Sequence, residues 1–204
     1  MNTSELIKYK NRGGSWELGN DTLYELCRVY PGHKTSQEIV AKIWLIGRAY
    51  AAAIERRKNK KTENDNFYES VVVPKIINSQ IDMYLYKLKN EKEISEEIIG
   101  VILMTHKYVT DLFTEISGIE KRSLASKYLH FHLPDLFYIY DSRAVNSLRS
   151  ILPRFRIDNT YKLSDREYGK FFLKLNYIDK TILRNEGVKL TPRELDNILL
   201  SYES

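Results

Sequence analysis

Residues 117–149 read SGIEKRSLASKYLHFHLPDLFYIYDSRAVNSLR, a stretch that contains a turn, two helical patterns and an apolar run between them. Gly118 marks a turn, after which the apolar spacing of SLASKYLHF predicts a helix that carries Lys127. Pro134 ends that pattern, and the apolar run LFYIY leads to Asp141, which can cap a second helix through SRAVNSLR. The stretch therefore predicts two helices joined by a short connection, with a lysine on the first and an aspartate at the start of the second.

The sequence before this stretch also has helical periodicity. A first helix is expected to be capped by Asn20 and to stop at Pro31. Thr35 and Glu38 then have the spacing of a capping box, which predicts a second helix that continues through Lys58. The apolar residues of this second helix fall on one face at spacings of three and four, so we expect it to pack against a core.

Helical patterns continue on both sides of the central stretch. Residues 67–90 are helical in pattern, with an end or kink expected at Pro74. Ser95, Asp165 and Thr191 stand at the starts of three further helices, the last with proline at its first turn. Since no strand pattern of convincing length interrupts these segments, we predict an all-α fold of roughly eight to ten helices.

The whole chain, residues 1–204, has a hydrophobic fraction of 43%, which is enough to bury a sizeable core. It contains no repeat and no linker between independent domains, so we expect one helical domain with two lobes that share a continuous core. The single cysteine, Cys27, lies between apolar positions of a helix and is expected to be a buried thiol. Because neither a disulfide pair nor a signal or membrane segment is evident, we expect a reduced, cytoplasmic compartment and no membrane.

The formal net charge of +5 favours a polyanionic partner only modestly, because 27 acidic residues accompany 32 basic ones. Local clusters are more informative. Residues 56–66, RRKNKKTENDN, are expected to form either a solvated connection or an edge that contacts phosphates. Arg48 lies in the most apolar part of its helix, next to Gly47 and several alanines, so it is expected either to form a buried ion pair or to point into a cleft.

Familiar enzyme signatures are absent from the sequence, which has no P-loop, dinucleotide fingerprint, GxSxG or CxxC pattern. His130 and His132 face away from each other on a helix and have no third ligand at a usual spacing. We therefore expect neither a metal nor another cofactor.

The turn at Gly118 can also serve binding. A helix that begins after it near Ser123 would present free backbone amides, which suit a phosphate, and Lys121 and Arg122 add positive charge there. Asp141 has two interpretations from local chemistry alone. It is either a simple helix cap or a cap whose partly desolvated carboxylate is catalytic.

Taken in order, the turn, the basic helix, the proline-marked connection and the hydrophobic approach to Asp141 resemble the core of the helix-hairpin-helix DNA glycosylase superfamily. The likeness is closest to 8-oxoguanine DNA glycosylase-like bacterial proteins. It is strongest over ASKYLHFHLPDLFYIYDSRA at residues 125–144, and AKIWLIGRAYAAAIERR at residues 41–57 is a second similar segment. The resemblance implies two helical lobes with a cleft between them, into which a modified base is flipped from duplex DNA.

The resemblance also implies roles within a hairpin and catalytic segment at residues 111–149. Asp141 matches the catalytic aspartate, which would stabilise positive charge on the deoxyribose. In bifunctional members a lysine attacks the sugar as a free amine, which requires a lowered pKa. Lys121 has a separation from Asp141 close to that of the family, whereas Lys127 lies in the most family-like segment and is preferred here.

Two further sets of residues are expected around this centre. The residues expected to contact DNA are Gly118, Arg122, Arg143, Arg56, Arg57, Arg154 and Arg156. The residues expected to line the base pocket are Arg48, Trp44 and Tyr140. The sequence departs from the family at the hairpin, where Glu120 replaces an expected second glycine and would repel a phosphate. The single cysteine excludes the iron-sulfur variant of the superfamily.

These observations support a monomeric DNA glycosylase that cleaves the N-glycosidic bond of a damaged or modified base, with a lysine-dependent lyase step as one branch. The alternative is a non-catalytic helical module on the same scaffold that binds nucleic acid or a protein through its basic surface. A third reading is a helical protein that binds a small molecule through Trp16, Trp44 and its tyrosines.

Overall fold

The computed structural model describes residues 1–11, 14–55, 66–156 and 165–202. Within these ranges every regular element is helical and no strand occurs, so the predicted all-α class is confirmed for them. The α-helices are α1 (Thr3–Leu6), α2 (Glu17–Val29), α3 (Ser36–Ala49), α4 (Val73–Ile77), α5 (Ile81–Leu88), α6 (Glu96–Ser117), α7 (Arg122–His132), α8 (Ser142–Ile151), α9 (Arg166–Glu186) and α10 (Pro192–Tyr202).

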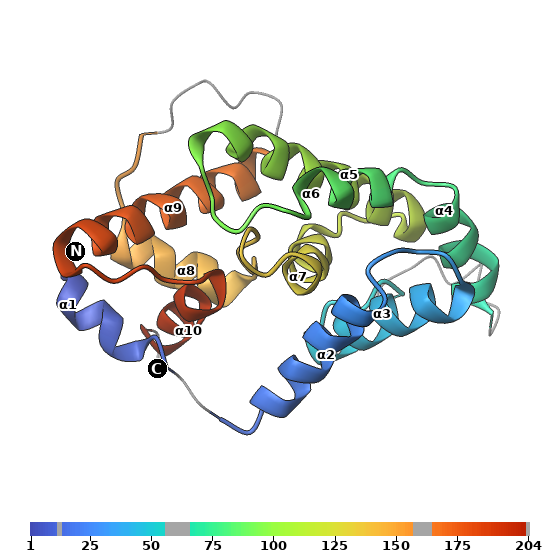
Figure 1. Cartoon of the computed structure of the whole chain (residues 1–204), viewed down its shortest axis with the longest axis horizontal. Helices are drawn as coiled ribbons and strands as arrows, with labels where there is room; N and C mark the ends of the chain where they lie inside the picture. The colour runs from blue at the N-terminus through green and yellow to red at the C-terminus, as the bar shows by residue number, and fades with distance from the viewer. Residues whose placement is uncertain (12–13, 56–65, 157–164, 203–204) are drawn as a thin grey trace.

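The helices form two groups with α7 between them (Figure 1). In one group α8 packs against α9 and α10. In the same group α1 packs against α9, and the short 3-10 turn Ile7–Tyr9 packs against α10. In the other group α2 packs on α3, α3 packs on α4, and α5 packs on α6. Helix α7 contacts α2, α3 and α6 of the second group, and the connection that follows it leads into α8 of the first group, so the central stretch of the sequence joins the two groups.

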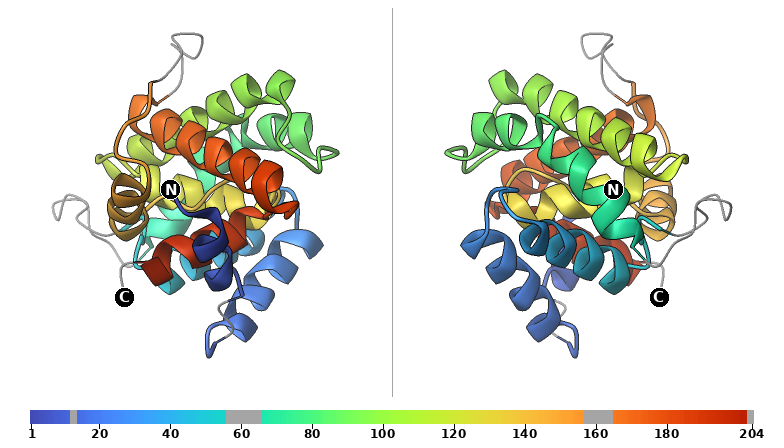
Figure 2. Two further views of the ribbon diagram at one scale, coloured as in Figure 1. Left: turned by 90° about the vertical axis from the view of Figure 1, so that its left-hand side faces the viewer. Right: turned by 90° about the vertical axis from the view of Figure 1, so that its right-hand side faces the viewer.

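The two ends of the chain meet in the first group. Figure 2 shows the N-terminal helix α1 lying against the C-terminal helices. Thr3 and Ser4 of α1 both donate hydrogen bonds to Glu186 at the end of α9, at 2.5 and 2.8 Å. The C-terminal helix α10 packs against α8, whose first residue follows Asp141.

The buried apolar side chains form one continuous cluster that extends from Leu6 in α1 to Leu199 in α10. Phe113 of α6 and Tyr128 of α7 are completely buried at its centre, where their rings pack edge to face. Cys27 is buried as expected, and burial raises the pKa of its thiol to about 12. Among the described residues, no helix combines the length and apolar character needed to cross a membrane.

Helix α3 begins where the sequence predicts but ends earlier. The Thr35 hydroxyl accepts a hydrogen bond from the Glu38 amide, which confirms the cap. The expected continuation through Lys58 is wrong, because the helix stops at Ala49. Ala51 has a φ of 50°, outside the right-handed region, and the Ala52 amide donates back to the Gly47 carbonyl at 2.8 Å.

Gly47 allows this reversal of the chain after α3. A methyl group at Gly47 would lie 3.1 Å from the Ala53 Cα atom and 3.7 Å from the Ala52 carbonyl oxygen. Glycine at this position therefore permits the close approach of the backbone of Ala52 and Ala53. The consequence is that the segment from Tyr50 to Ala53 folds back over the end of its own helix and reaches the central stretch.

One other local expectation is wrong. Asn20 is not an N-cap, because α2 begins at Glu17 and Asn20 lies inside it. Of the two outcomes expected at Pro74, an end of the helix does not occur. A π-helical segment, Tyr68–Val72, passes directly into α4, so the helix changes type next to Pro74, which lies in the first turn of α4, where proline is tolerated. The break in this region comes between α4 and α5.

The other predicted helix starts are present. Asp141 caps α8 by accepting from the Ala144 amide at 2.9 Å, and Asp165 caps α9 by accepting from the Tyr168 amide at 3.1 Å. At the start of α10, Thr191 and Glu194 exchange hydrogen bonds as a capping box. Between α6 and α7 the chain turns at Gly118, whose φ of 75° favours glycine.

Candidate functional site

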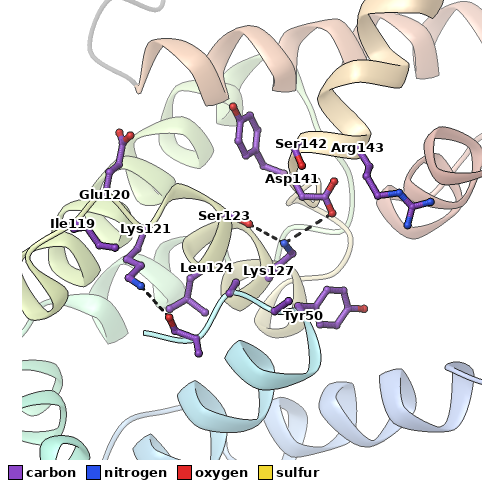
Figure 3. A pocket seen from close by; sticks show the side chains of 14 residues that line it. Tyr50, Ile119, Glu120, Lys121, Ser123, Leu124, Lys127, Asp141, Ser142 and Arg143 are labelled. Carbon is purple, nitrogen blue, oxygen red and sulfur yellow. Dashed lines mark hydrogen bonds and ion pairs between the residues drawn. The ribbon is translucent and has the colours of Figure 1, made fainter. Parts of the chain in front are cut away.

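A cavity of about 580 Å³ opens where three segments converge (Figure 3). The first is the folded-back segment after α3, the second is the start of α7 with the turn before it, and the third is the junction that leads into α8. The lining residues are Tyr50, Ala51, Ala52, Ala53, Ile119, Glu120, Lys121, Ser123, Leu124, Lys127, Tyr140, Asp141, Ser142 and Arg143. This volume lies in the range of about 300–1,000 Å³ that is usual for small-molecule sites.

Lys127 lies on α7 and points into this cavity toward Asp141 (Figure 3). Only 3% of its side chain is exposed. Its amine donates a hydrogen bond to the Ser123 hydroxyl at 2.8 Å, one helical turn earlier. Burial lowers the pKa of Lys127 below its usual value, although Asp141 and Asp196 oppose this shift. Near neutral pH a larger fraction of Lys127 is therefore in the neutral amine form than is the case for a surface lysine.

Asp141 caps α8 with one carboxylate oxygen, while part of its carboxylate remains exposed. One of its carboxylate oxygens accepts from the Ala144 amide at the start of α8, and the other lies 3.9 Å from the Lys127 amine. Its side chain remains 29% exposed, so the carboxylate is accessible from the cavity. The cap interpretation is thus confirmed, and the geometry also allows the carboxylate to face a bound molecule.

Lys121 lines the same cavity on another side. Its amine donates to the Ala53 carbonyl at 2.9 Å and points toward the folded-back segment after α3 (Figure 3). The ammonium thus ties the turn before α7 to that segment. Lys127, in contrast, is the lysine that lies beside Asp141.

Two side chains on α7 bind the connection between α7 and α8, which ends at Asp141. The Ser126 hydroxyl accepts a hydrogen bond from the Tyr140 amide at 3.0 Å. One turn later, His130 Nδ1 lies 2.8 Å from the Phe137 carbonyl and must donate to it. Both side chains are completely buried. The distance between Lys127 and Asp141 is therefore set by bonds between α7 and its own following connection.

A buried polar network lies behind this pair. Because His130 Nδ1 donates to a carbonyl, its Nε2 atom accepts from the Tyr24 hydroxyl at 2.6 Å. Burial lowers the pKa of His130 to about 3, consistent with a neutral ring. Arg193 of α10 donates to the Tyr24 hydroxyl at 3.0 Å and to the Tyr50 hydroxyl at 2.9 Å. Tyr50 lines the cavity, so the network links α10 to the wall around Lys127.

Asp196 is the acidic member of this network. Its Oδ2 atom accepts from Arg193 at 3.2 Å, whereas its buried Oδ1 atom has no hydrogen-bond donor among the described residues. Burial raises the pKa of Asp196 to about 6; Arg193 and Lys127 oppose this shift, and the negative charge of Asp141 adds to it. Asp196 is therefore protonated in mildly acidic solution and ionised at alkaline pH.

This shift makes stability depend on pH. The native pKa of about 6 exceeds the usual aspartate pKa of about 3.9 in the unfolded chain, so the native state binds more protons between these values. The free energy of unfolding of the wild type should therefore fall, relative to Asp196→Asn, as pH rises from about 4 to about 6. The expected change is up to about 3 kcal/mol, measured by urea denaturation at several pH values.

The opposite sign is expected at Asp165, whose pKa is lowered by its hydrogen bond and charge interaction with Arg122 despite burial. The stability of Asp165→Asn relative to the wild type should fall as pH rises through about 4. A pH-independent difference for Asp196→Asn would contradict the assignment of a raised pKa to that carboxyl.

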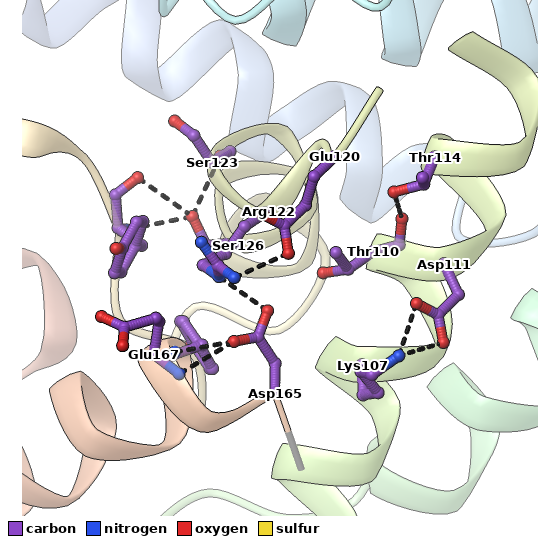
Figure 4. Close-up of polar contacts among 12 residues, drawn as sticks. Lys107, Thr110, Asp111, Thr114, Glu120, Arg122, Ser123, Ser126, Asp165 and Glu167 are labelled. Atoms are coloured by element: carbon purple, nitrogen blue, oxygen red, sulfur yellow. Dashed lines mark hydrogen bonds and ion pairs between the residues drawn. The ribbon is translucent and has the colours of Figure 1, made fainter. Parts of the chain in front are cut away.

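The turn before α7 is closed by ion pairs (Figure 4). Arg122 donates to Glu120 at 2.6 Å and to Asp165 at 2.6 Å, and only 19% of its side chain is exposed. Its guanidinium also lies 5.6 Å from the centre of the Tyr140 ring. Of the residues expected to bind DNA at the hairpin, Arg122 is thus occupied by two carboxylates. Gly118 lies at the turn, and a Cβ atom added there would have no neighbouring heavy atom within 4 Å.

The expected pocket residues are only partly brought together. Tyr140 lines the cavity, whereas Arg48 and Trp44 do not. Arg48 forms an ion pair with Glu55, as one alternative proposed, but 61% of its side chain is exposed, so the expected burial is wrong. Arg48 lies instead in a neighbouring depression of about 340 Å³ with Ala51 and Ala53.

The remaining basic residues lie at the surface. Arg143 is exposed at the rim of the cavity, and Arg154 and Arg156 are exposed after α8. Arg56 and Arg57 lie outside the described residues. Within the described ranges, no group of three or more His, Cys, Asp or Glu side chains is arranged to hold a metal ion.

Sequence reasoning missed the residues that support the pair. Ser123, Ser126 and His130 surround Lys127 in the same helical segment, so their spacing of three and four from one another offered a signal. Arg193 and Asp196 offered only the i, i+3 spacing of opposite charges on one helix. Nothing in that spacing indicates that the two residues lie beside Lys127.

Fold and site together define an all-α protein with a lysine–carboxylate cavity at the junction of two helix groups. No family model matches the chain, and comparisons with curated proteins and with solved structures find no significant match.

Proposed function

We propose that this protein is a DNA glycosylase that removes a damaged or modified base flipped from duplex DNA into the 580 Å³ cavity. The observation that carries the proposal is the Lys127–Asp141 pair, with a buried amine 3.9 Å from a carboxylate that faces the same cavity. The carboxylate suits stabilisation of positive charge on a sugar, and the amine beside it suits attack on the same sugar carbon in the lyase branch.

The chemistry assigned to the pair is as follows. The bond between the base and C1′ breaks, and the electron pair leaves with the base, which is protonated on release. The Asp141 carboxylate stabilises the positive charge that develops on the sugar. In the hydrolytic reaction a water molecule adds to C1′, and the proton it loses is the one taken up by the base. In the lyase branch the neutral Lys127 amine forms the bond to C1′ instead of water, and the proton it loses goes to the base. The lowered pKa of Lys127 favours the neutral amine that this step needs.

The geometry favours Lys127 over Lys121 as the amine. The Lys127 amine makes one hydrogen bond, to Ser123, and has Asp141 as its counter-ion at a longer distance. Lys121 is held by the Ala53 carbonyl. An amine beside the carboxylate can attack the same sugar atom whose charge that carboxylate stabilises.

The cavity walls also suit a flipped base. Tyr50 and Tyr140 contribute aromatic side chains on two sides, and Leu124 contributes an apolar one. Extrusion of a base costs a few kcal/mol, and stacking and pocket contacts offset this cost. Arg143 at the rim could contact a phosphate of the same strand.

A specific observation favours a second function, that of a non-catalytic module on the same scaffold. Glu120 stands at the turn where a phosphate would bind, and Arg122 is paired with Glu120 and Asp165. A module of this kind would bind nucleic acid or a protein through other basic surfaces and cleave nothing.

The experiment that separates the two functions is incubation of the protein with a panel of duplexes, each carrying one modified base. We expect at least one duplex to acquire an abasic site, detected as strand cleavage after alkali treatment. Salt-dependent binding to the duplexes without an abasic product from any of them would contradict the glycosylase proposal and favour the module.

A further inference from the structure

A second, smaller cavity of about 260 Å³ adjoins the first, between the end of α8 and the beginning of α9. Three basic side chains line it, Arg149 from α8 and Lys170 and Lys174 from α9. Glu167 is the acidic residue in its wall, and Phe171 and Leu148 form part of its apolar surface. The three cations give this groove a positive charge.

The three cations have no ion-pair partner among the residues that the structure describes, Glu167 included. In contrast, Lys180 and Lys189, also in the last third of the chain, pair with Glu96 and Glu93. Within the described part of the chain, the groove therefore holds three positive charges that no carboxylate pairs with.

The fold holds the positively charged Lys174 side chain in the groove. The residue is only 6% exposed, and its amine donates to the Leu152 carbonyl at 2.6 Å. Burial lowers the pKa of Lys174, and the nearby charges of Lys170 and Arg149 lower it further. An anion in the groove would relieve both the burial cost and the mutual repulsion of the cations.

The groove and the Lys127–Asp141 cavity share one wall. Tyr140 lines both hollows, and its ring packs edge-on against Phe171 at 5.1 Å. Its neighbour in sequence is Asp141. A nucleotide held in the first cavity would therefore have the adjoining backbone of its own strand next to the groove.

We propose that the groove of Arg149, Lys170 and Lys174 binds a backbone phosphate of the DNA strand whose nucleotide occupies the Lys127–Asp141 cavity, a role that rests on the proposed function of that cavity. Arginine can hold two phosphate oxygens with its fork of donors, and lysine acts as a point charge. Pro153 also lines the groove, so the exposed Arg154 that follows it extends the basic surface along the same path. The phosphate contacts that Glu120 disfavours at the hairpin are thereby supplied from another side of Tyr140.

The test is the salt dependence of binding to an unmodified fluorescent duplex, measured by anisotropy for Arg149→Ala, Lys170→Ala and the double variant. The logarithm of the association constant falls with the logarithm of salt concentration by about 0.9 per phosphate neutralised. Because both side chains contact the same phosphate, the double variant should reduce that slope by about 0.9, and each single variant should reduce it by part of that amount. Lys180→Ala is the matched control, because it removes a lysine of the same helix that is already paired with Glu96.

Slopes for Arg149→Ala and Lys170→Ala equal to that of Lys180→Ala would overturn the proposal, as would no binding of the wild type to duplex DNA. Titration with inorganic phosphate distinguishes the source of the ligand. Phosphate binding that is lost in the double variant, without duplex binding, would assign the groove to a free phosphate and overturn the DNA assignment.

Base excision is measured on the same proteins, so the two proposals can fail separately. Reduced slopes without excision by the wild type would support phosphate binding by the groove and contradict the glycosylase proposal. Excision with unchanged slopes would support the glycosylase proposal and contradict phosphate binding by the groove. Melting temperatures of all variants establish that each is folded.

Discussion

Asp141→Asn should reduce the single-turnover rate of base excision by roughly 10³-fold, because it removes the negative charge that stabilises the developing positive charge on the sugar. Asparagine is itself a good helix cap, so the bond to the Ala144 amide and the start of α8 should persist. Binding to the duplex should change little. The rate is measured with enzyme in excess over a duplex from the panel that the wild type cleaves.

The chain offers a matched control at Asp165, which also caps a helix but does not line the cavity. Asp165→Asn makes the same chemical change and preserves the cap, although it weakens the ion pair with Arg122. Excision by this variant should stay within a few-fold of the wild type. An Asp141→Asn variant that excises as fast as Asp165→Asn would remove Asp141 from the mechanism.

Lys127→Met should abolish the covalent protein–DNA adduct that borohydride traps on an abasic or lesion-bearing duplex. The reason is that the trapped bond forms between the lysine amine and C1′ of the sugar, and no amine remains. Methionine fills a comparable volume with flexible apolar atoms, so packing of α7 should be retained. The adduct is detected as a slow-migrating band in a denaturing gel.

Lys121→Met is the paired control, since it removes the other amine that lines the cavity. It should leave the adduct in place, with some loss of stability because the bond to Ala53 is lost. An adduct that persists in Lys127→Met and disappears in Lys121→Met would assign the amine to Lys121.

Local chemistry explains which parts of the fold the sequence could predict. The caps at Thr35, Asp141, Asp165 and Thr191 are correct because a cap is a contact between residues two or three positions apart. The end of α3 is wrong because the chain reverses at Ala51 through a backbone conformation that alanine rarely adopts. Helical periodicity contains no sign of such a reversal.

The same distinction applies to the site. Lys127 and Asp141 could be singled out because both lie in one short stretch, and the structure places them 3.9 Å apart. Arg193 and Asp196 could not, because they act on the cavity only through the bond from Arg193 to Tyr50 and the charge of Asp196 near Lys127. Only a long-range contact gives these two residues their place.

Buried polar groups show the same limit of sequence reasoning. Lys42 belongs to a periodic helix, yet it is completely buried and donates to the carbonyls of Tyr30 and Gly32 at the end of α2. His33 likewise bonds to Asp82 and to Tyr128, 49 and 95 residues away in the sequence. Partners at such separations are fixed by the fold and not by spacing.

The most direct test of the central claim is the release of free base from a mixture of duplexes with modified bases, followed by mass spectrometry of the released fraction. The account predicts that the wild type releases at least one modified base, while Asp141→Asn releases it roughly 10³-fold more slowly. Release of the same base at the wild-type rate by Asp141→Asn, or of none by the wild type, would contradict it.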